Sequence, residues 1–316
     1  MKKLTLIWLA TAFAGTAVAQ SKISNPEQKV VVVTGARFSY KLIEKWIDEY
    51  TRTTPGVQII VESRGSSDPQ RYDILAEVYE HPADIKEKRQ YLHIGRYAVL
   101  PVATANSSFA KLYSREGLTK QHITQIFFHD LFADKEKEKP IKTPYTVYTR
   151  LQKAGVPMVF SQHFGYEQKD IKGTGIAGAD THLIKALLRD STGVTYLPSA
   201  MIYDEGGKPI DGLTVIPVDL NGNGKISEEE KIVDQFGKVV SKLELSEANQ
   251  VKNIPIDYLH LSVDKQSASP EAIAFLKWVN ENGQKYLHQF GFFLPLEKND
   301  GTTNFNEFVS RKQKSK

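Results

Sequence analysis

The chain has 316 residues, of which 41% are hydrophobic, and it contains no cysteine. The apolar fraction excludes a mainly disordered chain, and the lack of cysteine excludes a disulfide scaffold, an iron–sulfur protein, a thiol catalyst and a cysteine-anchored lipoprotein. The formal net charge of +4 is too small to indicate binding to nucleic acid.

The first residues have the three parts of a secretory signal. Lys2 and Lys3 form a positively charged start, residues 4–15 are apolar, and Ala17-Val18-Ala19 is a small-x-small cleavage site. The apolar stretch is too short to span a bilayer comfortably. We therefore expect a cleavable signal peptide over residues 1–19 and a periplasmic protein that is not a lipoprotein.

Strand and helix patterns alternate along the chain that follows. β-branched runs over residues 29–33 and 57–61 predict strands. Helical spacing of apolar residues predicts one helix over residues 40–51 and another over residues 71–79. The order strand, helix, strand, helix is typical of a parallel α/β sheet.

The same alternation continues to the end of the chain. Further strands are predicted over residues 97–103, 143–149, 193–197, 214–218 and 258–263. Further helices are predicted over residues 119–128 and 179–189. Ser269 can cap the last long helix, with Pro270 as its first residue.

Two predicted strand-to-helix turns carry small polar residues, and each contains an arginine: residues 34–39 with Arg37, and residues 63–67 with Arg64. A helix N-terminus attracts anions, and arginine adds a bidentate donor. Serine and threonine also cap helices without binding a ligand. Because ligands of open α/β sheets lie beyond the carboxyl ends of the strands, two such turns favour an anion site. The candidate residues are Thr34, Arg37, Phe38, Ser39, Gly65, Ser66 and Ser67.

The stretch from Asp219 to Glu230 fits the calcium-loop pattern position by position, with Gly224 at the sharp turn. The alternative is a hairpin turn, because Asn-Gly occurs twice. Only one of the first three side-chain ligands is charged, so we expect modest affinity for a structural Ca²⁺ ion. No organic cofactor is expected. The candidate calcium ligands are Asp219, Asn221, Asn223, Lys225 through its carbonyl, Ser227 and Glu230.

Motifs of hydrolases are missing from the sequence. It has no GxSxG, no HExxH and no cysteine nucleophile, and its eight histidines are scattered. A secreted phosphatase-like enzyme is therefore disfavoured, and we predict that the protein is not an enzyme.

Segments of the chain, taken in order, resemble the periplasmic phosphate-binding proteins of ABC transporters. They include TGARFSYKLIEKWIDEY at residues 34–50, VESRGSS at 61–67, GLTKQHITQIF at 117–127, STGVTYLPSAMIYD at 191–204 and the closing helix at 269–295. The calcium-like insert is similar to one in the Bacteroidetes branch of these proteins.

The resemblance implies an α/β, two-lobed periplasmic-binding-protein-like fold of type II. Its sheets would be mixed and mostly parallel, flanked by helices, with two crossings between the lobes. Lobe I would comprise residues 28–103 and 251–316. Lobe II would comprise residues 104–250 and contain the calcium-like loop 219–230.

The same resemblance implies that phosphate is held between the lobes. Arg150 would supply the arginine of the second lobe, although the family's Ser-Gly-Thr after that arginine is replaced here by residues 151–155, Leu-Gln-Lys-Ala-Gly. The family also has an aspartate that accepts a proton from phosphate, and the candidates here are Asp73 and Asp84. Since Arg37 and Arg64 add positive charge, a more highly charged or carboxylated anion stays open.

Two hypotheses of different classes follow. The first is an exported, monomeric solute-binding protein that captures an inorganic anion, phosphate above all, and delivers it to an ABC permease. The second is a degenerate binding-fold protein that acts as a sensor or as an adhesion or interaction module, or that binds a different oxyanion. Neither involves nucleic acid or insertion into a membrane.

Overall fold

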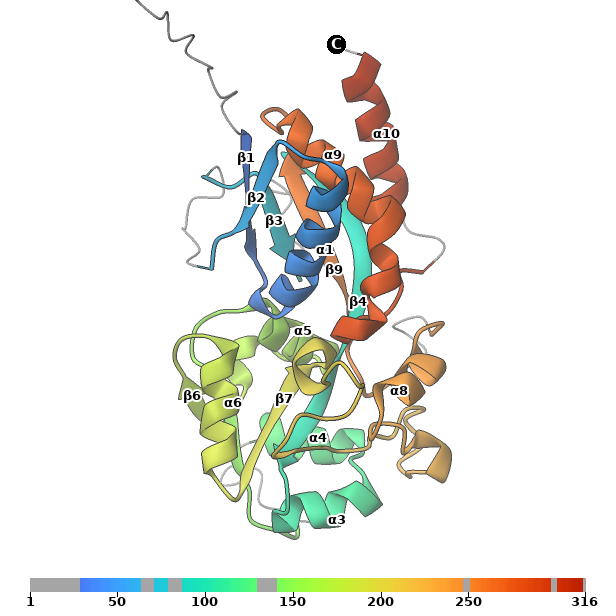
Figure 1. The fold of residues 1–316 in the computed structure, drawn as a ribbon. Coiled ribbons are helices and arrows are strands. Elements are labelled where there is room, and N and C mark those ends of the chain that lie inside the picture. The colour runs from blue at the N-terminus through green and yellow to red at the C-terminus, as the bar shows by residue number, and fades with distance from the viewer. Residues whose placement is uncertain are drawn as a thin grey trace, which may run out of the picture.

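The structure, a computed structural model, describes residues 29–63, 71–78, 87–129, 141–246, 251–296 and 300–314. The predicted signal peptide at residues 1–19 lies outside them. Within the described ranges, no helix is long and apolar enough to cross a membrane. Figure 1 shows these elements gathered in two lobes, one above the other.

The upper lobe in Figure 1 contains a sheet with the strand order β2-β1-β3-β9-β4. Helix α1 lies on this sheet, and its Trp46 is fully buried and donates a hydrogen bond to the Gly283 carbonyl (2.9 Å). Segments near both ends of the described chain therefore contribute to this lobe. Its elements are β1 (Lys29–Gly35), α1 (Tyr40–Thr53), β2 (Val57–Val61), β3 (Ile74–Glu77), β4 (Arg89–Thr104), β9 (Ile256–Asp264), α9 (Pro270–Trp278) and α10 (Asp300–Lys314).

In the lower lobe the strand order is β4-β7-β5-β6, and β8 also pairs with β4. Phe160 stacks on Tyr196 with ring centroids 4.0 Å apart, which packs a helix onto the centre of this sheet. The elements are α3 (Ser108–Glu116), α4 (Lys120–Phe127), β5 (Thr146–Arg150), α5 (Gly155–His163), β6 (Thr174–Ile176), α6 (Asp180–Arg189), β7 (Gly193–Pro198), α7 (Ser199–Ile202), β8 (Leu213–Val215) and α8 (Phe236–Leu243).

Strand β4 runs through both lobes. It pairs with β9 up to Ala98 and with β7 from Val99 onward. The chain returns beside it, because the Val99 N–H donates to the Pro255 carbonyl (2.9 Å) just before β9 begins. Two neighbouring segments thus cross between the lobes, as the resemblance implies. The lobe boundaries after residues 103 and 250 stay a prediction.

The structure corrects two expectations about the sheets. The helix predicted over residues 71–79 is wrong, because Ile74–Glu77 form β3 and all four side chains are buried. A short apolar run fits a buried strand as well as a helix, so spacing alone cannot separate the two. The sheets are mixed but not mostly parallel, since four of the eight pairings between described strands are antiparallel, all of them involving β4 or β9.

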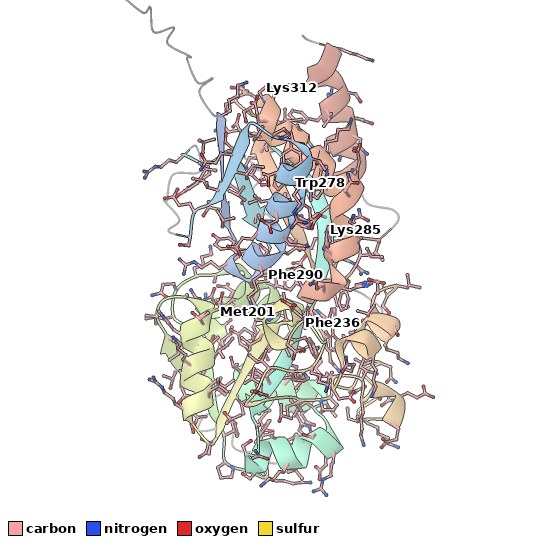
Figure 2. The ribbon with its side chains drawn as sticks, in the orientation of Figure 1. Met201, Phe236, Trp278, Lys285, Phe290 and Lys312 are labelled. Atoms are coloured by element: carbon pink, nitrogen blue, oxygen red, sulfur yellow. The ribbon has the colours of Figure 1, made fainter. Side chains whose placement is uncertain are left out.

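A buried arginine joins the two lobes near the crossings. Arg96 on β4 is 2% exposed, and its guanidinium donates to the carbonyls of Leu294 (3.1 Å), Ser246 (3.0 Å) and Glu244. Since Glu244 follows α8 directly, Arg96 provides donors for the carbonyls at the C-terminal end of that helix. Phe236 of α8, labelled in Figure 2, stacks on Phe293 beside Leu294, with ring centroids 5.6 Å apart.

We expect acid to remove one local contribution to the stability of the lower lobe. Asp190, between α6 and β7, accepts hydrogen bonds from the Thr192 N–H and hydroxyl (2.8 Å each) and from the Tyr148 hydroxyl (3.0 Å). The bond from the Thr192 N–H is the main reason that the pKa of Asp190 lies below its usual range. A lowered carboxyl pKa in the folded state adds stability above the unfolded pKa of about 4, and this stability is lost as the pH falls through the folded value.

Urea unfolding of the wild type and of Asp190→Asn at pH 7, 5 and 3 checks this expectation. The difference in the free energy of unfolding should be constant from pH 7 to 5 and smaller at pH 3. The exposed Asp211→Asn is the control. A difference that stays constant down to pH 3 contradicts the assignment.

Candidate functional site

A cavity of about 320 Å³ lies between the two lobes. Its upper wall is the turn after β1 together with β3, and its lower wall is the end of β5 with the starts of α5 and α6. The cavity therefore lies at the carboxyl ends of β1, β3 and β5, where ligands of α/β sheets bind. Its lining residues are Gly35, Ala36, Arg37, Phe38, Leu75, Ala76, Glu77, Val78, Arg150, Ala154, Gly155, Val156 and Asp180.

The upper wall depends on a glycine. Gly35 has φ +132°, and a Cβ at this position would lie 1.9 Å from the Ala76 carbonyl oxygen. The Ala36 N–H donates to that same oxygen (2.7 Å) and fixes the turn against β3. The 3₁₀ turn Arg37–Ser39 then leads directly into α1. Within this turn the Ser39 N–H donates to the Ala36 carbonyl (3.0 Å) and the Tyr40 N–H donates to the Arg37 carbonyl. The backbone donors that this wall offers are therefore the N–H groups of Arg37 and Phe38, which come first in the turn.

The predicted residues of the first turn divide into two groups. Arg37 and Phe38 line the cavity. Thr34 and Ser39 are buried and do not line it: the Thr34 hydroxyl donates to the Glu62 carbonyl (2.7 Å), and the Ser39 hydroxyl donates to the Ala36 carbonyl (2.7 Å). These two hydroxyls hold the turn in place, so their contribution to a site is to position its backbone.

The second predicted turn is described only at its beginning. Val61 at the end of β2 pairs with Val33 of β1, and Glu62 N–H donates to the Val33 carbonyl (2.8 Å). The chain therefore leaves β2 at the edge where β1 ends. Arg64 and the predicted ligands Gly65, Ser66 and Ser67 lie outside the described residues.

Arg150, at the end of β5, brings the lower lobe's positive charge to the cavity. Its Nη1 is 2.6 Å from Oδ1 of Asp180, the first residue of α6, and only 12% of the arginine side chain is exposed. Its Nε is buried and has no hydrogen-bond partner within the described residues. The sequence had indicated Arg150 only through the resemblance. It had not indicated Asp180, whose one signal is an acidic residue at the start of a predicted helix.

Neither aspartate proposed as a proton acceptor lines the cavity in the described structure. Asp73 accepts a hydrogen bond from the Val32 N–H (2.8 Å) and holds β1 in register, while Asp84 lies outside the described residues. The acidic residues that do line the cavity are Glu77 and Asp180. Glu77 is buried and accepts a hydrogen bond from the Ser262 hydroxyl (2.7 Å). Sequence reasoning missed Glu77 because it lies in the segment predicted to be a helix.

The loop of residues 219–230 follows β8 in the chain, contributes no residue to the lining of the cavity, and has a defined geometry. The Asp219 carboxylate accepts three backbone hydrogen bonds (2.7–3.1 Å), from residues 222, 223 and 224. The Glu230 carboxylate accepts the Leu220 N–H (2.8 Å) and both the N–H (2.8 Å) and the hydroxyl (3.0 Å) of Ser227. Gly224 has φ +80°, as its place at the sharp turn requires.

Both carboxylates of this loop are buried, Asp219 to 1% and Glu230 to 4% exposure. Burial raises the pKa of Glu230, but the hydrogen bonds from Ser227 and Leu220 together lower it by more, so Glu230 is held ionised. Among the described residues, no cluster of three or more His, Cys, Asp and Glu side chains forms a metal site. The loop instead combines two carboxylates with amide, hydroxyl and carbonyl oxygens.

Comparisons with known proteins identify the fold. No protein-family model and no curated protein matches the sequence. Among solved structures, a candidate phosphate ABC transporter substrate-binding protein from Clostridium perfringens, solved with bound phosphate, aligns with a TM-score of 0.62 at 12% identity and covers 84% of this chain and 100% of that one. An ABC-type phosphate transport receptor from Vibrio cholerae aligns with a TM-score of 0.52 at 11% identity, with coverage of 84% and 100%.

The chain thus has the mixed α/β fold of the type II periplasmic binding proteins. Within this class it resembles the phosphate-binding proteins of ABC transporters, as the sequence motifs had indicated. The regulatory domain of CcmR from Synechocystis, solved in complex with 2-PG, shares the fold with a TM-score of 0.51 at 12% identity, over 80% of this chain and 97% of that one. Since one fold carries transport and regulatory proteins, function has to be argued from the site.

Proposed function

We propose that this chain is an exported solute-binding protein that captures phosphate between its lobes and delivers it to an ABC permease. The observation that carries the proposal is the position of Arg150 in the cavity between the lobes. One arm of its guanidinium is fixed by Asp180 (2.6 Å), and its buried Nε has no partner within the described residues.

An anion in this cavity would be contacted from both lobes. Arg150 supplies a charge-assisted donor from below, and the backbone N–H groups of Arg37 and Phe38 supply donors from above. A buried donor left without a partner costs about 1–3 kcal/mol, so a bound oxyanion removes an existing cost at Nε. Because neither lobe alone surrounds the ligand, binding favours the closed arrangement of the lobes.

The two acidic residues of the cavity favour phosphate over sulfate. Glu77 and Asp180 line the same space as Arg150. An ionised carboxylate accepts hydrogen bonds but donates none, so it attracts an anion only through a proton that the anion carries. Phosphate retains a proton at neutral pH and sulfate does not. Selectivity for phosphate over sulfate then comes from carboxylates that repel an anion without a proton.

The proposal includes a periplasmic location and an ABC permease as the partner. The predicted signal at residues 1–19 supports a periplasmic location, and the phosphate-transport proteins among the structural neighbours support an ABC permease as partner. By their names, the first of those neighbours is a substrate-binding protein and the second is a transport receptor, which supports a role without catalysis. Clean protein should therefore not turn over a phosphomonoester.

Calorimetric titration of mature protein (residues 20–316) with phosphate and then with sulfate tests the proposal. We expect micromolar or tighter binding of phosphate and at least tenfold weaker binding of sulfate. Protein that is folded by circular dichroism and gives no heat with either anion would overturn the proposal and support the degenerate binding-fold alternative. Tighter binding of sulfate would overturn the role assigned to Glu77 and Asp180.

A further inference from the structure

The loop of residues 219–230 joins two segments that are distant from it in sequence. The Asp219 N–H donates to the Leu118 carbonyl (3.0 Å), and a Cβ on Gly117 would lie 2.5 Å from the Ile226 side chain. On its other side the Lys252 N–H donates to the Leu220 carbonyl (2.9 Å). Lys252 belongs to the segment that leads into β9, so the loop holds the chain where it returns to the upper lobe.

The buried carboxylates of the loop favour the binding of a cation. Asp219 and Glu230 are both almost fully buried, and the hydrogen bonds that reach their carboxylates come from neutral N–H and hydroxyl groups. Within the described residues no salt bridge involves either side chain. Burying a charge without an opposite charge is costly. One divalent cation would neutralise both.

Asn253 provides an independent observation from outside the loop. It is 1% exposed, and its Nδ2 donates to the Asp219 carbonyl (2.7 Å), so its side chain ends at the first residue of the loop. Its Oδ1 is also buried and has no hydrogen-bond partner in the described part of the chain. A buried amide oxygen of this kind needs a donor, a water or an ion.

We propose that residues 219–230 bind Ca²⁺ and that the bound ion fixes the returning segment at Lys252 and Asn253 to the lower lobe. Calcium suits this site because every donor is an oxygen and because the ion accepts six to eight such ligands in a flexible loop, whereas Mg²⁺ demands a smaller octahedral cage. The ligands are the side chains of Asp219, Asn221, Asn223, Ser227 and Glu230 and the carbonyl of Lys225.

The proposal does not depend on what the cleft binds. Calcium at this loop would add one folded-state ligand to the lower lobe and order one of the two crossings between the lobes. We therefore expect it to raise the melting temperature by binding only the folded chain. It should also slow hydrogen exchange at the Lys252 amide, whose acceptor is the loop residue Leu220.

Metal-free mature protein titrated with Ca²⁺ by calorimetry, and melted with 1 mM Ca²⁺ or with EDTA, tests the site. We expect binding in the micromolar range and a rise in melting temperature of about 5 °C. Glu230→Gln should weaken Ca²⁺ binding at least tenfold and remove most of the rise. Glu229→Gln should leave both unchanged, because Glu229 is exposed and stands at the eleventh position, which supplies no ligand.

Two further results complete the test. If Glu230→Gln does not fold, Asn221→Ala, an exposed ligand, should weaken Ca²⁺ binding, whereas Lys225→Ala, which retains the carbonyl, should not. Wild-type protein with no Ca²⁺ heat and identical melts in Ca²⁺ and EDTA would overturn the site. Calcium binding that leaves hydrogen exchange over residues 251–254 unchanged would overturn the coupling to the returning segment.

Discussion

Arg150→Ala should weaken phosphate binding at least a hundredfold. The guanidinium is the lower lobe's charged donor in the cavity, and removing one partner of a buried charge pair costs about 3 kcal/mol, or a factor of a hundred or more in the dissociation constant. Arg150→Lys should recover only part of the affinity, because an ammonium group keeps the charge but lacks the planar fork. Calorimetric titration with phosphate measures both.

Controls separate a lost ligand contact from a changed fold. Arg189→Ala removes an exposed arginine at the other end of α6 and should leave the affinity unchanged. Arg150→Ala also leaves Asp180 without its ion pair, so the double variant with Asp180→Ala shows how much of the loss comes from that carboxylate. If Arg150→Ala melts like the wild type and binds phosphate equally well, Arg150 is not part of the site.

Gly35→Ala should lower the free energy of unfolding by about 3 kcal/mol, because it combines two unfavourable effects. Its φ of +132° is one that residues with a side chain rarely adopt, and its Cβ would lie 1.9 Å from the Ala76 carbonyl oxygen, which accepts the Ala36 N–H. The upper wall of the cavity would have to move. Phosphate affinity should therefore fall even under conditions where the variant stays folded.

Gly237→Ala is the matched control for this variant. Gly237 lies on the exposed side of α8, and a Cβ there would meet nothing within 4 Å. The substitution should be neutral or stabilise the chain by about 0.5–1 kcal/mol, since alanine favours a helix more than glycine does. Urea unfolding of both variants gives the comparison. Equal stabilities for Gly35→Ala and Gly237→Ala would mean that the turn after β1 is not constrained as described.

The sequence predicted the elements whose patterns are long or bounded by clear signals. Strand β1, helix α1 and strand β2 lie where the β-branched runs, the apolar spacing of residues 40–51 and the Thr-Pro-Gly break placed them. The Ser269 cap is confirmed as well, since its side chain accepts the Ala272 N–H. These signals are local, so one sequence suffices to read them.

The structure departs from the sequence-based prediction where a contact joins distant segments. The sequence of residues 74–77 does not indicate that they pair with β1 and β9, and it is this pairing that makes them a strand. The ion pair between Arg150 and Asp180 joins the end of β5 to the start of α6, and the spacing of residues in the sequence does not predict it. The first turn was predicted as an anion site, but Thr34 and Ser39 turn their hydroxyls to backbone carbonyls instead.

The central claim is that one anion lies between Arg150 and the turn after β1. A crystal structure of the mature protein grown with phosphate tests it most directly. The account predicts tetrahedral density within hydrogen-bond distance of Arg150 Nε and of the backbone N–H of Arg37 or Phe38, with the two lobes closed upon it. Phosphate held elsewhere, or an empty cavity at saturating phosphate, would contradict it.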